Sequence, residues 1–276
     1  MIVFPNVKIN LGLNIVEKRP DGYHNLETVF YPVPLCEALE IVPAKGDSDV
    51  LNVFGAQVSG DPNANLVMRA LSALRKDFPQ IPALEVSLLK KLPMGAGLGG
   101  GSSDGAFMLK MLNECYGLGL SQQQLIEYAA KLGADCPFFL VNKPVYATGI
   151  GEIMQPVGMS LEGYSIVLVK PDVFVSTKEA FAGIKPKPTS LSARDIVSMP
   201  VEQWKDLLVN DFENTIFPLH PEIAEVKDKL YSAGAVYSAM SGSGASVLAL
   251  FAPGKDVPSP ALFPGCFFFQ TVLPPI

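Results

Sequence analysis

Several features that mark other protein classes are missing from this chain of 276 residues. It has no basic run, and its formal net charge is −6, so we expect no nucleic-acid partner. No window approaches about 18 uninterrupted apolar residues, and residues 1–6 lack the charged start of a signal peptide. We therefore expect a cytoplasmic protein with no membrane partner.

Cysteine is also sparse. The four cysteines, Cys36, Cys115, Cys136 and Cys266, show no C-x-x-C spacing, which argues against a zinc site or a disulfide framework. We expect them to be buried, reduced thiols. With 49% hydrophobic and 17% charged residues, the chain has the composition of a compact protein and is long enough for two domains.

The chain does have a glycine-rich stretch at residues 93–106, PMGAGLGGGSSDGA, in which six of fourteen residues are glycine. A helical pattern follows at residues 107–115. Glycines let backbone amides turn toward one spot, and a helix N-terminus adds its unpaired N–H groups and positive dipole end. The stretch therefore predicts an anion site, and a nucleotide phosphate is the anion that it favours. Ser102, Ser103 and Asp104 are expected to cap the helix and are able to bind phosphate or a metal.

Two common phosphate-loop families do not fit this stretch. The P-loop pattern G-x-x-x-x-G-K-[ST] is missing. Gly95, Gly97 and Gly100 spell G-x-G-x-x-G, but a strand with an acidic residue should then follow the helix. Residues 121–132 instead predict a second helix, opened by a capping box from Ser121 to Gln124. A flexible linker is also disfavoured, because the stretch lies between a strand pattern and a helix pattern.

Two polar side chains stand out on the first predicted strand, residues 7–15, where apolar and polar residues alternate. Lys8 and Asn10 would project from one face of this half-buried strand, and a solvated face is the alternative explanation. Residues 19–22 form a predicted tight turn. The returning strand, residues 23–31, would bring Tyr23 and His24 near the end of the first.

Asp135 follows Gly133, which is expected to end the second helix. We expect Asp135 at an exposed corner before an extended Cys136–Pro137 step. By itself, an aspartate at such a corner is usually only a turn residue.

The remaining patterns predict an α+β chain with a domain boundary between residues 158 and 159, giving domains 1–158 and 159–276. Further strands are expected at 39–43, 51–54, 84–89 and 164–170, and a hairpin at 144–157 that turns at 149–151. Further helices are expected at 65–75, 176–183, 192–198, 201–209 and 221–232. A second small-residue loop at 237–251 leads into a strand, and the tail from residue 253 is expected to be partly irregular.

Three separated motifs resemble one superfamily, the GHMP kinases. Residues 93–106 are similar to its phosphate loop, residues 8–11 (KINL) to its first motif, and residues 240–245 (MSGSGA) to its third. Within the superfamily, residues 19–30 (RPDGYHNLETVF) look like the signature of the 4-diphosphocytidyl-2-C-methyl-D-erythritol kinases. Residues 133–139 and 210–214 also resemble that family. The chain departs from the pattern at three positions: Cys136 replaces an aliphatic residue, Gly105 replaces the usual alanine, and Ile150 replaces a common basic residue.

The resemblance implies a two-domain GHMP kinase fold, with an N-terminal domain like ribosomal protein S5 and a C-terminal ferredoxin-like domain. It implies a transferase of the non-mevalonate isoprenoid route that phosphorylates the 2-hydroxyl of its cytidine-diphosphate substrate, with ATP as co-substrate and Mg²⁺. Substrate and ATP would meet between the domains. A monomer or weak homodimer is expected.

The resemblance also assigns roles to residues. Lys8 and Asp135 match the family's catalytic pair, in which Asp135 accepts the hydroxyl proton and Lys8 stabilises the charge of Asp135 and of the transferred group. Ser103 is the candidate metal neighbour. ATP-binding residues would be Pro93, Met94, Gly95, Ala96, Gly97, Leu98, Gly99, Gly100, Gly101, Ser102 and Ser103. Substrate-binding residues would be Asn10, Tyr23, His24, Lys91, Thr177 and Phe181.

Two rival functions are weighed against this one. Another GHMP kinase, such as a homoserine or mevalonate kinase, has no reason to carry the GYHNL run at residues 22–26. A non-catalytic sensor on the same fold has no reason to keep both Lys8 and Asp135.

Overall fold

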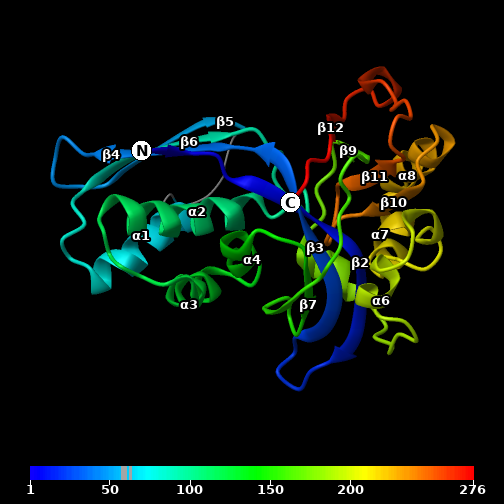
Figure 1. Ribbon diagram of the computed structural model, residues 1–276, viewed down its shortest axis with the longest axis horizontal. Coiled ribbons are helices and arrows are strands. Elements are labelled where there is room, and N and C mark those ends of the chain that lie inside the picture. Colours follow the sequence, from blue (N-terminus) through cyan, green and yellow to red (C-terminus); the bar gives the residue numbers. More distant parts are fainter. Residues whose placement is uncertain (57–60, 62–63) are drawn as a thin grey trace. The chain divides into compact units, whose positions relative to one another are not determined.

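The computed structural model describes residues 1–56, 61 and 64–276, shown as a ribbon in Figure 1. These residues form two compact units that alternate along the chain. The first unit comprises Met1–Val7, Leu35–Met94 and Gly99–Asn142, and the second comprises Lys8–Pro34, Gly95–Leu98 and Lys143–Ile276. The division at residue 158 concerns domains continuous in sequence and stays a prediction. Among the described helices, none is both long and apolar enough to cross a membrane.

The first unit is a four-stranded sheet covered by helices. The strands run in the order β1–β4–β6–β5, where β5 and β6 are parallel and the other neighbours antiparallel. Figure 1 shows α1 and α2 against one face of this sheet. The elements are β1 (Ile2–Val3), β4 (Ala38–Pro43), β5 (Val50–Gly55), α1 (Leu66–Asp77), β6 (Leu84–Lys90), α2 (Gly100–Cys115), α3 (Gln122–Leu132) and α4 (Cys136–Val141).

Alternation along β6 decides what faces the helices of the first unit. Leu84, Val86 and Leu88 are buried, whereas the residues between them are partly or fully exposed. Because successive side chains of a strand point to opposite faces, Lys90 continues the buried row. A charged residue therefore lies at a core-facing position beside α2.

The second unit contains two antiparallel sheets. One has the order β2–β3–β7–β8 and includes the long hairpin predicted from the turn at residues 19–22, and Gly22 has the expected positive φ of 88°. The first residues of β2 and the last of β3 extend into the first unit. The strands are β2 (Asn6–Lys18), β3 (His24–Cys36), β7 (Val145–Thr148) and β8 (Ile153–Pro156).

The other sheet of the second unit has the spatial order β10–β11–β9–β12, with all neighbours antiparallel. Numbered by sequence, this is the 2-3-1-4 order of a ferredoxin-like β-α-β-β-α-β unit. The second connecting helix is reduced to a single 3-10 turn, η3. The elements are β9 (Ser165–Lys170), α5 (Thr177–Ala182), α6 (Ala193–Val197), η2 (Val201–Gln203), α7 (Glu213–Leu219), α8 (Pro221–Ser232), β10 (Tyr237–Met240), β11 (Val247–Phe251), η3 (Pro260–Leu262) and β12 (Phe267–Val272).

Two sequence predictions about elements were wrong. The helix expected at 201–209 is only the short turn η2, while α7 was missed because Pro218 lies inside it. The strand β10 precedes the small-residue loop, so residues 237–251 form a hairpin rather than a loop and one strand. The tail from residue 253 is partly irregular as predicted, and it also contains η3 and the edge strand β12.

Two burial predictions were also wrong. Along β2 both faces are buried, and Lys8 and Asn10 are only 4% and 3% exposed, because their polar atoms are bonded inside the second unit. The cysteines are free thiols as predicted, but only Cys136 is buried, and Cys115 is exposed.

Candidate active site

Part of the glycine loop is hydrogen-bonded to the second small-residue loop. Within the second unit, the amide of Ala245 donates to the carbonyl of Gly95 (3.1 Å), and the hydroxyl of Ser241 donates to the carbonyl of Gly97 (3.0 Å). A methyl group on Gly97 would lie 2.1 Å from the carbonyl oxygen of Ser241. Only glycine permits this approach, so two motifs about 145 residues apart fit together at backbone distance.

The first motif joins the same place. The amide of Lys8 donates to the carbonyl of Leu98 (3.0 Å), and the amide of Asn10 donates to the hydroxyl of Ser241 (3.2 Å). All of these residues belong to the second unit. The three motifs that carry the family resemblance are therefore bonded to one another.

Lys8 has a buried position on β2. Its ammonium donates to Oδ1 of Asn10 (2.6 Å) and lies 4.7 Å from the ring centre of Phe30. The side-chain amide nitrogen of Asn10, Nδ2, in turn donates to the hydroxyl of Thr28 (3.1 Å). This network orients Asn10 and fixes the ammonium of Lys8. Lys8 and Asp135 belong to different units, and their pairing stays a prediction.

The N-terminus of α2 differs from the sequence prediction. The helix begins at Gly100, and its N-cap is Gly99 in the left-handed conformation, with φ of 71°. Ser102 and Ser103 therefore lie inside the first turn and do not cap it, which leaves the early amides of α2 without a side-chain cap. Gly99, Gly100, Gly101, Ser102 and Ser103 belong to the first unit, as do Pro93 and Met94, whereas the loop residues Gly95–Leu98 belong to the second.

Two buried oxygens at the start of α2 lack partners. Within the described part of the chain, Ser103 Oγ and Asp104 Oδ1 have no hydrogen-bond partner. Burial raises the pKa of Asp104 above its ordinary value, although Lys90 acts in the opposite direction. An unpaired hydroxyl is the kind of hard oxygen donor that Mg²⁺ accepts alongside phosphates and water. No group of three His, Cys, Asp or Glu side chains able to hold a metal occurs in residues 1–56, 61 and 64–276. Ser103 therefore fits a supporting ligand better than a complete metal site.

Asp135 is the N-cap of α4, in the first unit with α2. Cys136 is the first residue of α4, so the predicted extended Cys136–Pro137 step was wrong, and the backbone of Asp135 is also helical (φ −82°, ψ −18°). Pro137 lies in the first turn of α4, where an amide donor is not needed. Asp135 is half-buried rather than exposed. Burial raises the pKa of the Cys136 thiol to about 11, against the effect of a hydrogen bond with Ser102. Asp135 thus adjoins a residue in contact with the first turn of α2.

The residues expected to bind cytosine are partly assembled in the second unit. His24 begins β3, and its ring stacks on that of Phe181 from α5, with centroids 4.9 Å apart and an interplanar angle of 20°. Phe181 packs edge-on against Phe212, which fixes the stack. Tyr23 is 61% exposed, and Thr177 is exposed at the start of α5. One face of the His24 ring is therefore covered by Phe181, and the role of His24 in binding cytosine stays a prediction.

Lys91 follows the last residue of β6 and has an exposed side chain. Its amide donates to Oε1 of Glu37 (3.2 Å), as does that of Leu92 (3.2 Å). Glu37 also contacts Lys90, which pairs with Asp104 (2.7 Å). This buried cluster was not predicted from the sequence.

Two family models and several known kinases match this chain. Residues 65–143 match the family model "GHMP kinases N terminal domain", and residues 195–259 match "GHMP kinases C terminal". The chain is 55% identical over 275 residues to the 4-diphosphocytidyl-2-C-methyl-D-erythritol kinase of Bacteroides fragilis, covering 99% of this chain and 100% of that protein. This chain belongs to that kinase family.

Other relatives agree with the assignment to the 4-diphosphocytidyl-2-C-methyl-D-erythritol kinases. The enzyme of that name from Porphyromonas gingivalis is 47% identical over 276 residues, covering 99% of this chain and 100% of the relative. A crystal structure of a 4-(cytidine 5'-diphospho)-2C-methyl-D-erythritol kinase matches with a TM-score of 0.82 and 30% identity, covering 98% of both chains. A Methanococcus jannaschii mevalonate kinase matches with a TM-score of 0.70 at 12% identity, covering 98% and 97%, and shows the shared fold alone. The predicted α+β, two-domain GHMP kinase fold is confirmed.

Sequence reasoning missed the residues that hold the kinase's third motif in place. Asn210 donates to the carbonyls of Met240 (2.7 Å) and Gly242 (2.8 Å), and Glu213 accepts from the amide of Met240 (2.7 Å). Residues 210–214 were noticed as similar to the family, yet only their position in the fold shows this anchoring role.

Glu27 was also missed. This buried carboxylate accepts from Asn14 (3.0 Å), Tyr146 (2.6 Å) and Thr189 (2.8 Å), tying β3 to β2, β7 and the loop after α5. It lies three residues from His24 and stabilises the strand that carries it.

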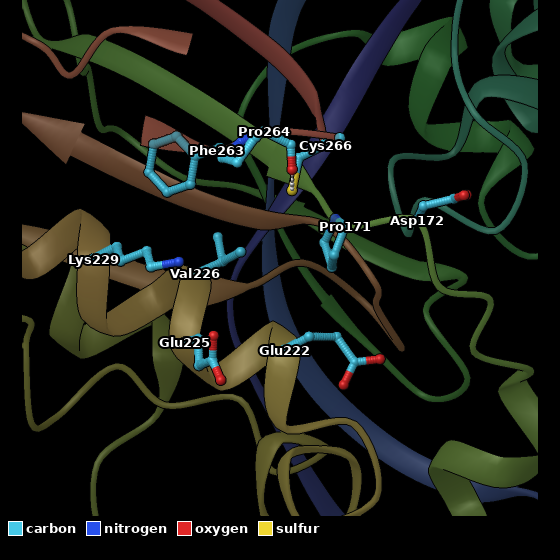
Figure 2. Close-up of a pocket in the computed structure, with 10 residues that line it drawn as sticks. Pro171, Asp172, Glu222, Glu225, Val226, Lys229, Phe263, Pro264 and Cys266 are labelled. Carbon is cyan, nitrogen blue, oxygen red and sulfur yellow. Dashed lines mark hydrogen bonds between the residues drawn. The ribbon is translucent and has the colours of Figure 1, made fainter. Parts of the chain in front are cut away.

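A pocket of about 370 Å³ lies elsewhere in the second unit, between α8 and the segment before β12 (Figure 2). None of the predicted site residues lines it. Asp172, Glu222 and Glu225 bring three carboxylates to its wall against the one ammonium of Lys229. This charge balance disfavours an anionic nucleotide, so the pocket does not compete with the glycine loop as the nucleotide site.

Proposed function

We propose that this protein transfers the γ-phosphoryl group of ATP to the 2-hydroxyl of 4-diphosphocytidyl-2-C-methyl-D-erythritol. The observation that carries the proposal is the bonding of residues 8–10, Gly95–Leu98 and residues 241–245 into one structure. A structural loop needs no such convergence, whereas phosphoryl transfer depends on holding phosphates and acceptor in fixed positions.

The proposed reaction is a direct transfer. The substrate hydroxyl oxygen attacks the γ-phosphorus, a new P–O bond forms, and the bond to the bridging β–γ oxygen breaks to release ADP. Asp135 accepts the hydroxyl proton. Lys8 stabilises the negative charge of the transferred group, held in place by Asn10 and Phe30.

The nucleotide phosphates are proposed to bind the early amides of α2, which have no side-chain cap. Ser103 is proposed to help hold Mg²⁺, which would supply charge neutralisation at the triphosphate. On the acceptor side, His24 reads the cytosine edge beside Phe181, Tyr23 and Thr177 frame it, and Asn10 and Lys91 hold substrate. Cytoplasmic location and a monomeric or weakly dimeric state remain predictions from the sequence.

Acceptor specificity tests the proposal. Purified protein with ATP and Mg²⁺ should release ADP with the cytidine-diphosphate substrate and not with homoserine or mevalonate. Preference for either alternative acceptor would assign a different GHMP kinase activity. Binding of the cytidine substrate without ADP release would indicate a sensor.

A further inference from the structure

Three charged side chains form a buried cluster in the first unit. The ammonium of Lys90 contacts Oε2 of Glu37 and lies 2.7 Å from Oδ2 of Asp104. Glu37, Asp104 and Lys90 are 1%, 2% and 8% exposed. Two carboxylates and one ammonium give the cluster a formal charge of −1 when all three groups are ionised. Buried charges are costly unless they are paired, so each member depends on the others.

The cluster lies directly beneath the start of α2. A methyl group on Gly100 would be 3.5 Å from Oε2 of Glu37 and 3.7 Å from the ammonium of Lys90. Asp104 lies five residues after the N-cap Gly99 on the same helix. Glu37 also accepts the amides of Lys91 and Leu92, on the chain segment that leads to the glycine loop. The cluster thus contacts both sides of the proposed phosphate site.

Charge at this position acts on any anion bound above it. The N-terminus of α2 carries a positive partial charge that favours phosphate. The carboxylates below it oppose that attraction when they are ionised, and charges in a poorly solvated region interact more strongly than they would in water. The positive charge of Lys90 compensates the negative charge of one carboxylate. Lys90 donates to Oδ2 of Asp104 (2.7 Å), and burial and the nearby carboxyl of Glu37 raise the pKa of Asp104, whereas Lys90 lowers it.

We propose that Lys90 is a positioning residue for the nucleotide, acting through Glu37 and Asp104 on the first turn of α2. It holds that turn against β6 and limits the negative charge beneath the bound phosphates. The proposal rests on the proposed function only in placing the ATP phosphates at the start of α2.

Variants that change the charge of the cluster but hardly its size should differ in their KM for ATP. Lys90→Met leaves a formal cluster charge of −2, and Lys90→Met combined with Asp104→Asn restores the wild-type value of −1. Asp104→Asn alone gives 0. The KM for ATP should rise about tenfold or more in Lys90→Met, return most of the way in the double variant, and be unchanged or lower in Asp104→Asn. The KM for the cytidine substrate should stay within about twofold throughout, because the cluster lies under the phosphate site.

A matched control separates charge from general stability. Asp49 pairs with Arg75 and accepts the amide of Leu84, at the opposite end of β6. Asp49→Asn should lower the unfolding temperature without changing the KM for ATP. If Lys90→Met fails to fold, the double variant and Asp104→Asn still test whether the KM for ATP follows the cluster charge. The proposal is overturned if the KM for ATP correlates with the decrease in unfolding temperature rather than with the cluster charge. It is also overturned if the KM for ATP is unchanged in Lys90→Met.

Calorimetric binding of ATP in the same variants distinguishes failure of this inference from failure of the proposed function. A wild-type protein that binds ATP but does not phosphorylate the cytidine substrate contradicts the proposed function. The order of ATP affinities among the variants would still support or overturn the role of Lys90.

Discussion

At the scale of single residues, Asp135 is the proposed acceptor of the substrate's hydroxyl proton. Asp135→Asn keeps the size and shape of the side chain, so the variant should fold with an unfolding temperature close to wild type. Turnover should fall by about two to four orders of magnitude, the usual contribution of a positioned base. Single-turnover kinetics at saturating substrates measures this. Near-normal turnover would remove Asp135 from the mechanism.

Lys8 is expected to act in the same step. Lys8→Met keeps the aliphatic stem but leaves Asn10 Oδ1 without its donor. The variant should lose turnover to a degree comparable with Asp135→Asn, and the double variant should be little worse than either, because residues that act as a unit are not additive. Multiplied losses in the double variant would show two independent roles.

His24 is expected to determine base specificity. His24→Ala should raise the KM for the cytidine substrate more than it lowers kcat, and should narrow the preference for cytosine over uracil. His24→Phe is the matched variant, since it can keep the stack on Phe181 while losing both ring nitrogens. It should lose the base preference as His24→Ala does. Retained preference in both variants, measured with a uridine analogue, would mean that the base is read elsewhere.

Thiol reactivity reports on the environment of Cys136. With a pKa of about 11, roughly one thiol in a thousand is ionised at pH 8, and the thiolate is the reactive form. Iodoacetamide at pH 8 should therefore modify the exposed Cys115 well before Cys136, as read by peptide mass spectrometry. Modification of Cys136 should increase only as the pH approaches 11. Equal rates at pH 8 would contradict its burial beside Ser102.

At the scale of elements, the close approach of two loops depends on Gly97. Gly97→Ala must place a Cβ on a backbone with φ of 70°, at a cost of about 1–2 kcal/mol. It must also displace the Ser241 carbonyl, 2.1 Å from the new methyl group. We expect a lower unfolding temperature and a KM for ATP raised by about tenfold or more, because the nucleotide loop shifts.

Gly158→Ala is the control for that substitution. Gly158 is exposed, does not have a positive φ, and has no neighbouring atom within 4 Å of the position that an added methyl group would take. Its substitution should leave both the unfolding temperature and the KM for ATP unchanged. If Gly97→Ala behaves like Gly158→Ala, the two loops are not packed as described.

Most helices, strands and turns could be predicted because their formation depends on residues that are close together in the sequence. The capping box at Ser121 and the turn at Gly22 both occur as expected. The start of α2 could not be predicted in this way, because Gly99 caps it through a left-handed backbone rather than a side chain. Residues 201–209 have an apolar pattern but form only η2, so local propensity was overridden by packing around the buried Trp204.

Long-range pairings explain why some site residues were missed. Leu39 pairs with Leu88 across β4 and β6, a register that extends to place Glu37 opposite Lys90. A sequence pattern does not show which strands are neighbours, so two charged residues at core-facing positions looked unrelated. The phosphate loop was predicted from its glycines and the helix that follows, and the catalytic role of Lys8 from its resemblance to a known motif. The anchoring role of Asn210 depends on hydrogen bonds to residues about 30 positions away.

At the scale of the whole molecule, the groups assigned to the proposed transfer come from both compact units. Motifs from the beginning, middle and end of the chain are bonded in the second unit, while α2 and Asp135 belong to the first. Family membership was predictable from sequence because these motifs are specific and span nearly the whole chain. The contacts that connect them became evident only in the fold.

The central claim is tested most directly by following the phosphoryl group itself. Protein, ATP, Mg²⁺ and the cytidine-diphosphate substrate are mixed, and ³¹P NMR resolves the phosphorus-containing products. The account predicts one new phosphomonoester resonance on the cytidine substrate, growing in step with ADP, with no release of inorganic phosphate. Unchanged ATP, or ADP formed together with inorganic phosphate and an unaltered cytidine substrate, would contradict it.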